Sequence, residues 1–218
     1  MSSNLIPLEG VSNQKKLLDA ALREFSERGF AGARVESIAR AAGLNVRLVY
    51  HYFGDKLGLY DAVLADVMNE LRKIVESFPL MRMTVDESSL RALFSRFFRL
   101  MLEKPQVARL LVSEIVGGAD HLTALKEKMP ELFEPVFRRA VALFRSFLGP
   151  HRPLDNDDSL WLLSLGGMTS FLAAGFEATK LFLGEEFATP DRWENAIYRA
   201  VRRVVGFGDV PAHSESEG

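Results

Sequence analysis

Residues 44–60 read "LNVRLVYHYFGDKLGLY" and contain the feature that decides the fold. Asn45 is a favourable helix N-cap and Gly54 a favourable helix stop, so the spacing predicts a helix of about eight residues between them. Two tyrosines, a histidine and a phenylalanine crowd its last four positions. Only one face of so short a helix can be buried, and we expect that face to hold Val49 and Phe53. The outward face then carries Val46, Arg47, Tyr50 and His51, which fits a DNA groove better than a solvated surface.

Two further helices are predicted ahead of this one. Apolar residues recur at helical spacing from Leu17 to Phe25 and again from Val35 to Ala42, and Gly29 and Gly43 follow as stops. The second and third helices, joined by "AGLN", form the helix-turn-helix pattern. Asp55 is expected to cap a long fourth helix that runs to about Glu76.

Residues 14–60 resemble the DNA-binding domain of the tetracycline-repressor (TetR) family. The resemblance lies in "LLDAALREFSERGF", "IARAAGL" and "VYHYFGDK", and it covers about a fifth of the chain. It implies that Asn45 caps the recognition helix and that Val46, Arg47 and Leu48 form its base-facing start. It also implies that Tyr50, His51 and Tyr52 contact phosphates or thymine methyl groups, and that Lys56 grips the DNA backbone.

Two positions depart from the pattern of that family. Its members usually carry Ser or Thr just before the second helix, where this chain has Ala33 and Arg34. Arg34 is expected to take over the phosphate contact. Position 48 is often Thr and is Leu here, which favours an apolar contact with a thymine methyl group. Both changes affect the expected operator sequence rather than the expectation of DNA binding.

Composition and charge narrow the classes of function. The net charge is −2, but residues 1–60 carry eight Lys/Arg and six Asp/Glu, whereas residues 61–218 carry nineteen and twenty-three. That asymmetry has the right sign for an N-terminal DNA contact. The chain has no cysteine, its four histidines lack metal-ligand spacing, and no phosphate loop or nucleophile motif appears. We therefore expect no catalytic activity, no cofactor, no metal and a cytoplasmic location.

The rest of the chain reads as helix almost throughout, which predicts an all-α fold. Helices are expected near 86–103, 105–117, 120–128, 130–148, 156–179 and 190–206. The predicted domains are a disordered arm (1–10), a three-helix DNA-binding domain (11–56), a helical effector-binding and dimerisation bundle (57–206) and a disordered tail (207–218).

The segment 159–176 contains no charged residue over eighteen positions. That length is near the lower limit for a membrane span, but its glycines, hydroxyl side chains and acidic flanks favour a helix buried between protein surfaces. With the helix at 190–206 it is the candidate dimer interface, as in the family; the alternative is that both helices form the core of one monomer. The interface residues expected are Leu160, Leu163, Gly166, Gly167, Ser170, Ala174, Trp193, Ile197 and Val201.

The middle helices are rich in phenylalanine and predict either an ordinary core or a cavity for an apolar small molecule. Glu114 lies in a mostly apolar segment, where a buried carboxylate would need Arg109 or a ligand as a partner; an exposed Glu114 is the alternative. The expected ligand-binding residues are Phe97, Met101, Leu110, Glu114, Phe137 and Phe171.

These expectations combine into a ligand-responsive repressor that binds palindromic double-stranded DNA as a homodimer and is released by a small apolar effector. The alternative is a DNA-bound interaction protein that is controlled by a protein partner. The sequence does not identify the effector, the operator or the regulated genes.

Overall fold

The structure is a computed structural model that describes residues 8–77, 87–148, 167, 169–171, 175–176 and 189–205. These residues form helices joined by short turns and no strand, which confirms the predicted all-α fold. The longer helices are α1 (Leu8–Gly32), α2 (Val35–Ala41), α3 (Val46–Phe53), α4 (Lys56–Glu76), α5 (Glu87–Glu103), α6 (Pro105–Val116), α7 (Asp120–Lys128), α8 (Pro130–Leu148) and α11 (Pro190–Val205).

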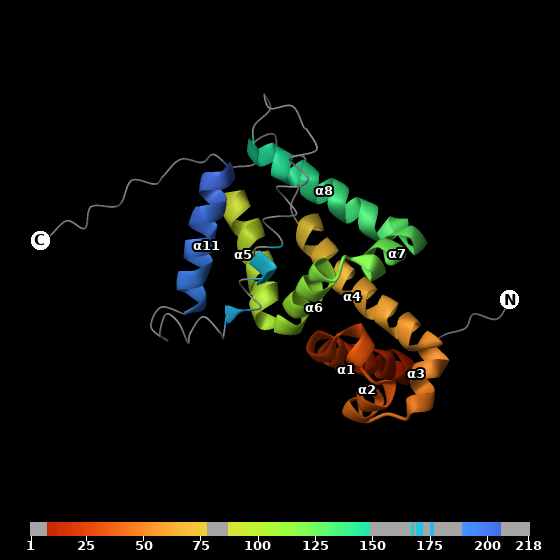
Figure 1. The fold of residues 1–218 in the computed structure, drawn as a ribbon. Coiled ribbons are helices and arrows are strands. Elements are labelled where there is room, and N and C mark those ends of the chain that lie inside the picture. The colour runs from red at the N-terminus through yellow and green to blue at the C-terminus, as the bar shows by residue number, and fades with distance from the viewer. Residues whose placement is uncertain are drawn as a thin grey trace, which may run out of the picture.

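The helices divide into a small head and a larger body (Figure 1). We call α1–α3 the head and α5–α8 with α11 the body. The helix α4 begins beside α3 and runs out of the head along α8. The head meets the body mainly through α1, which packs on α6, while α5 and α11 lie side by side at the far edge of the body.

The first helix differs from the prediction at both ends. It begins at Leu8, so residues 8–10 are helical although they were predicted to belong to a disordered arm. A single interior glycine such as Gly10 costs a helix only about 1 kcal/mol and does not end it. At the other end Gly29 breaks the helix, as predicted, with a φ of 66°, but one further turn follows and ends at Gly32.

The caps of α3 and α4 confirm two predictions. The Asn45 side-chain oxygen accepts a hydrogen bond from the Arg47 N–H (2.9 Å), and the Asp55 carboxylate accepts one from the Gly58 N–H (2.7 Å). Between the two helices Gly54 has a φ of 79°, a conformation that glycine adopts without strain. A side chain at Gly58 would collide with the Phe53 carbonyl, so the tight α3–α4 corner requires glycine at that position too.

One buried apolar cluster runs through head and body. In the head it includes the predicted stripe residues Leu17, Phe25 and Ile38, and it continues through α4 into α6, α7 and α8. The head therefore shares its core with the body, and this packing fixes the position of the head on the body.

Part of the predicted dimer segment lies outside the described residues. Leu160, Leu163, Gly166 and Ala174 belong to that part. Residues 1–7 and the tail from 206 also lie outside the described residues. Phe137 lies in α8 and Val201 in α11, but their side chains are not among those described. The other predicted body helices match the observed bounds within two residues. Within the described ranges, no helix is long and apolar enough to cross a membrane.

Candidate nucleic-acid interface

The helix α3 buries one side against the head and exposes the other. Val49 is fully buried in the core, whereas Arg47 and His51 are exposed and Tyr50 is 48% exposed. The His51 and Tyr52 rings lie 5.1 Å apart, so the two side chains support each other on the helix surface. The exposed face thus offers one guanidinium, one imidazole and the phenol group of Tyr50, whereas Tyr52 is partly buried against the core.

The prediction for the apolar residues of α3 needs correction. Val46, which was expected to face outward, is partly buried against the core cluster, and so is Leu48. Phe53, which was expected to be buried, is only partly so. On a helix of two turns the first residues lie close to the preceding helix, so a side chain at position 46 contacts the core edge while keeping part of its surface free.

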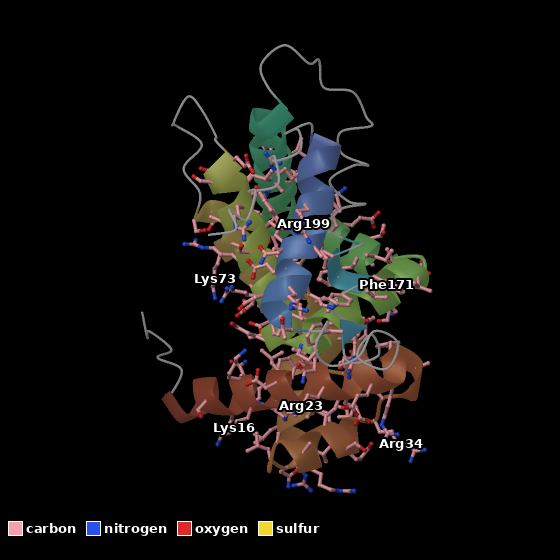
Figure 2. The ribbon with its side chains drawn as sticks, turned by 90° about the vertical axis from the view of Figure 1, so that its left-hand side faces the viewer. Lys16, Arg23, Arg34, Lys73, Phe171 and Arg199 are labelled. Atoms are coloured by element: carbon pink, nitrogen blue, oxygen red, sulfur yellow. The ribbon has the colours of Figure 1, made fainter. Side chains whose placement is uncertain are left out.

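Arg34 occupies the N-cap of α2 but makes no side-chain cap bond. Its backbone N–H donates to the Glu24 carboxylate at 3.3 Å, and the residue is exposed. Figure 2 shows Arg34 projecting from the lower edge of the head, away from the body. That placement is compatible with the predicted phosphate contact.

Lys56 is already engaged within the chain. Its ammonium group donates to the Ala31 carbonyl (3.2 Å) and lies 5.0 Å from the centre of the Phe30 ring. An ammonium group has three N–H donors, so at least one remains for a phosphate. The internal contacts hold Lys56 at the start of α4, where the helix N-terminus also favours an anion.

In the part of the head that the structure describes, ion pairs engage some basic residues and leave other arginines unpaired. Lys15 pairs with Asp19 and Asp66, and Arg28 pairs with Glu24. Within the described residues no ion pair involves Arg34, Arg40 or Arg47. Sequence reasoning did not select Arg40, an exposed residue in the last turn of α2. A lone arginine between alanines gave no pattern to distinguish it.

Glu114 is buried at the junction of head and body, and its partners differ from those predicted. Its carboxylate accepts a hydrogen bond from the Tyr60 hydroxyl (2.5 Å) and one from the Leu122 N–H (3.3 Å), and it lies 3.1 Å from His121 Nδ1. Arg109, the expected partner, is exposed, and the alternative of an exposed Glu114 is wrong because 6% of the residue is accessible. Burial and the Glu114 carboxylate raise the pKa of Tyr60 well above its usual range, which keeps the phenol protonated as a donor.

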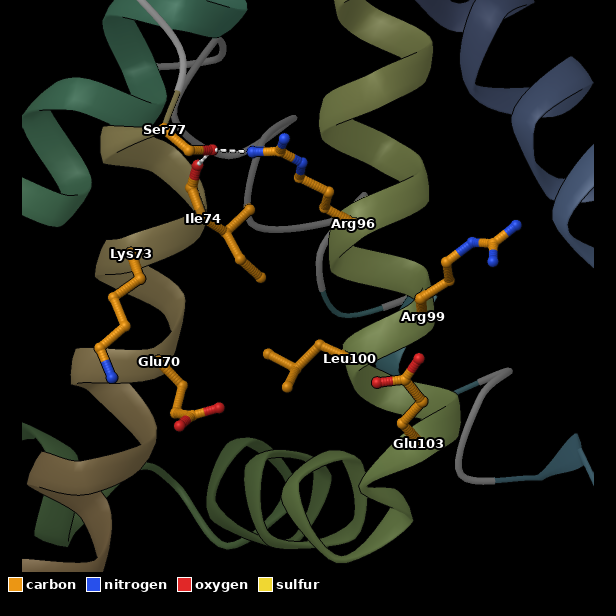
Figure 3. Close-up of a pocket in the computed structure, with 8 residues that line it drawn as sticks. All are labelled: Glu70, Lys73, Ile74, Ser77, Arg96, Arg99, Leu100 and Glu103. Atoms are coloured by element: carbon orange, nitrogen blue, oxygen red, sulfur yellow. Dashed lines mark hydrogen bonds between the residues drawn. The ribbon is translucent and has the colours of Figure 1, made fainter.

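The predicted ligand-binding residues do not converge on one described cavity. Met101 and Leu110 are fully buried in the body, Phe97 is partly buried and Phe171 is 64% exposed. A described pocket of about 330 Å³ lies instead between α4 and α5 (Figure 3). In that view Ile74 and Leu100 point into the gap and Arg99 points away from it. The remaining lining residues are Glu70, Lys73, Ser77, Arg96 and Glu103.

The described members of the predicted dimer interface are partly used within one chain. Ile197 and Ser170 are buried, and the Ser170 hydroxyl lies 3.9 Å from the Met101 sulfur. Trp193 is partly accessible and packs edge-on against Phe176 at 5.4 Å, and Gly167 is partly accessible as well. Burial of Ile197 and Ser170 inside one chain agrees with the alternative that these two residues belong to the core of the body.

Comparison with known proteins identifies the head. Residues 17–63 match the model of the bacterial regulatory proteins of the tetR family. Over 199 residues the chain is 29% identical to the HTH-type transcriptional repressor SCO4008 of Streptomyces coelicolor, and the match covers 89% of this chain and 95% of that protein. The head, with the start of α4, is a DNA-binding domain of the TetR family. The chain is also 36% identical to the HTH-type transcriptional regulator RutR of Escherichia coli K12 over 112 residues, half of either chain.

Solved structures extend the likeness to the fold of the whole chain. The fatty acid degradation regulator FadR from Bacillus halodurans superposes with a TM-score of 0.63 at 17% identity, covering 89% of this chain and 99% of that one. The TetR-family regulator PfmR from Thermus thermophilus gives a TM-score of 0.59 at 19% identity, covering 88% and 97%. At these identities the likeness concerns the fold alone, and it includes the body as well as the head.

The segment that matches the TetR-family model contains all the predicted DNA contacts. It runs from Leu17 in α1 to Val63 in α4, and so includes Arg34, the whole of α3 and Lys56. Tyr60, which donates to Glu114, also falls inside this segment, whereas Glu114 and His121 do not.

Proposed function

We propose that this chain is a TetR-family transcriptional repressor that binds a palindromic operator as a homodimer and is released by a small-molecule effector. The observation that carries the proposal is the exposed face of α3, a capped two-turn helix whose guanidinium, imidazole and phenol groups stand free on a rigid head. A helix of this kind fits the major groove and reads base edges with its N-terminal residues.

Arg47 is the side chain that we assign to base recognition. It is the second residue of α3, is exposed, and makes no side-chain bond within the described part of the chain. An arginine at this place can donate two parallel hydrogen bonds to a guanine, a contact worth about 1–3 kcal/mol of discrimination. Arg34, Tyr50, His51, Tyr52 and Lys56 are assigned to phosphates or thymine methyl groups around it, and Val46 and Leu48 to apolar contact with the bases.

A dimer follows from the small area of one head. Helix-turn-helix proteins place two recognition helices in successive major grooves, about 34–36 Å apart. We assign the interface to α11 and the 159–176 segment, with Trp193 as one of its aromatic residues. Ile197 and Ser170 support the interface from behind, because each is already buried in its own chain.

The effector is assigned to the body beside α4. The pocket between α4 and α5 combines two aliphatic side chains with a charged rim, so it suits an amphiphilic molecule better than a purely apolar one. Phe97 and Met101 also belong to α5 but do not line this pocket. An effector that spreads α4 from α5 would tilt α4, which spans about 30 Å and begins at the head. A coupling of about 1–3 kcal/mol is typical of such devices.

In this proposal the chain catalyses no reaction. It acts in the cytoplasm, where its DNA partner would be. Its family is one of transcriptional regulators, and a body that couples a ligand to the head needs no catalytic group.

Binding stoichiometry tests the proposal. Sedimentation of the purified chain with a duplex that carries its selected operator should give two chains per palindrome. An isolated half-site should also take up two chains, but with far weaker affinity, because only one head of the dimer then contacts its bases. Equal affinity for half-site and palindrome would overturn the dimeric reading. Small amphiphiles that release the duplex should lose their effect in Leu100→Trp, which fills the pocket; a release that survives this change would place the effector elsewhere.

A further inference from the structure

Glu114 makes its hydrogen bonds to two different helices. Tyr60, on α4, donates to it from one side, and the Leu122 N–H and the His121 imidazole, on α7, approach it from the other. Burying an ionised carboxylate is costly unless such partners satisfy it, and loss of one partner leaves the charge uncompensated. The carboxylate of α6 therefore holds α4 and α7 in one relative position.

An aromatic cluster extends this contact to the head. The Tyr60 ring lies 4.7 Å from Phe25 and 5.1 Å from Phe30, both on α1, and the His121 ring lies 4.7 Å from Phe30. Phe30 in turn lies under the Lys56 ammonium group. Direct contacts thus run without a gap from the buried carboxylate in the body to the first residue of α4, beside the recognition helix.

Hydrogen bonds to a charge restrain geometry in a way that apolar packing does not. Apolar side chains keep most of their contact energy after a small slide, whereas a charge-assisted hydrogen bond depends steeply on distance and angle. At this junction α1 packs on α6 through apolar side chains, and the Glu114 cluster adds the directional element.

We infer that Glu114, with Tyr60 and His121, is a positioning residue for operator recognition: the cluster holds the head at the angle that sets the distance between the two recognition helices. The inference rests on the proposed dimeric DNA binding. One extra base pair between half-sites moves the second site by about 3.4 Å and turns it by about 35°. A firmly held head cannot reach the displaced half-site, so the dimer binds that duplex weakly. A loosened head can reach it, so the dimer binds the altered spacing nearly as well.

The test measures affinity of the full-length protein for three palindromes: the selected operator, and the same half-sites with one base pair added or removed between them. Tyr60→Phe removes one hydroxyl and keeps the ring. Glu114→Gln keeps the shape and removes the charge. Lys128→Ala is the matched control, because the Lys128–Asp61 pair (2.6 Å) also joins α7 to α4 but lies at the surface.

We expect the wild type and Lys128→Ala to discriminate strongly between the three spacings. In Tyr60→Phe and Glu114→Gln the discrimination should fall about tenfold, the scale of one lost charged hydrogen bond. A general loss of stability would weaken binding to all three duplexes alike and leave the ratio between them unchanged.

Variants that keep the wild-type ratio would overturn the inference. If Glu114→Gln does not fold, Tyr60→Phe decides alone, since it preserves the packing of the ring. A wild type that binds palindromes without any preference for spacing would overturn the proposed dimeric function itself, and that failure is visible before any variant is made.

Discussion

In the proposed DNA interface, Arg34 is a residue at which stability and DNA binding favour different side chains. It stands at the N-cap of α2, where Ser or Thr would accept a hydrogen bond from the first turn, and it makes no such bond. The guanidinium is exposed and free of ion pairs within the described residues. The chain thus carries a poor cap where a phosphate-binding group is useful.

Replacement of Arg34 by serine should move stability and DNA affinity in opposite directions. The new cap should raise the free energy of unfolding by about 0.5–1 kcal/mol. The lost phosphate contact should weaken binding equally for operator and random DNA and lower the salt dependence by about one ion. Urea unfolding and anisotropy titrations at several salt concentrations measure the two effects. Unchanged DNA affinity would remove Arg34 from the interface.

Tyr60 should make the protein sensitive to alkali. Burial, and then the bond to Glu114, raise its pKa in the folded state above the ordinary value of 10.0. The stabilisation is complete below pH 10 and is lost as pH rises toward the folded pKa, because only the unfolded chain then releases the proton. Between pH 9 and 11 the stability of Tyr60→Phe should therefore fall less than that of wild type, by up to about 1 kcal/mol per pH unit. If urea unfolding shows that both proteins lose the same stability between pH 9 and pH 11, the buried hydrogen bond from Tyr60 to Glu114 is contradicted.

At the scale of elements, helix bounds were predictable and side-chain partners were not. Asn45, Gly54 and Asp55 act through bonds to their immediate neighbours, so their effect is visible in the sequence. Tyr60, Glu114 and His121 meet only after α4, α6 and α7 pack together, and a sequence separation of 54 residues between Tyr60 and Glu114 carries no periodic signal. The same limit explains why a buried Glu114 was anticipated but Arg109 was wrongly named as its partner within the chain.

The partial burial of Val46 belongs to this scale as well. The 3.6-residue period places a side chain on a face of its own helix, but the position of the neighbouring helix decides how much of that face is covered. The sequence therefore predicted the helix α3 and most of its exposed residues, but not how far the side chains of its first turn are buried against the core.

The contact between α4 and the loop before α6 predicts a response to acid. Glu70 bonds to Lys104 at 2.7 Å, and this hydrogen bond is the main reason that the pKa of Glu70 is lowered from 4.5. A lowered carboxyl pKa stabilises the fold above pH 4.5, and the contribution disappears as pH falls through the folded pKa. Glu70→Gln should thus be less stable than wild type at pH 7, by well under 1 kcal/mol because the pair is partly exposed, and the difference should shrink as the pH falls through the folded pKa of Glu70. A difference that stays unchanged as urea unfolding is repeated at falling pH would show that the charge is not its source.

At the scale of the whole molecule, the proposed function depends on a rigid connection between the pocket beside α5 and the DNA-binding head. In this proposal the shared core of head and body, the Glu114 cluster and the length of α4 together convert a small shift beside α5 into a larger one at α3. Residues 44–60 allowed the DNA-binding head to be predicted from the sequence. The sequence did not locate the effector site in the same way, because the side chains there are typical of any helical core.

The most direct test of the central claim is selection from random duplexes by the purified protein, with wild type beside Arg47→Ala, at two salt concentrations. The account predicts that the wild type enriches a palindrome at both salts, and that Arg47→Ala loses preference at one base pair of each half-site while keeping its fold. The affinity loss should be about 1–3 kcal/mol. Enrichment of the same sequence by both proteins, or only salt-sensitive binding without a consensus, would contradict the assignment of α3 as the element that reads DNA.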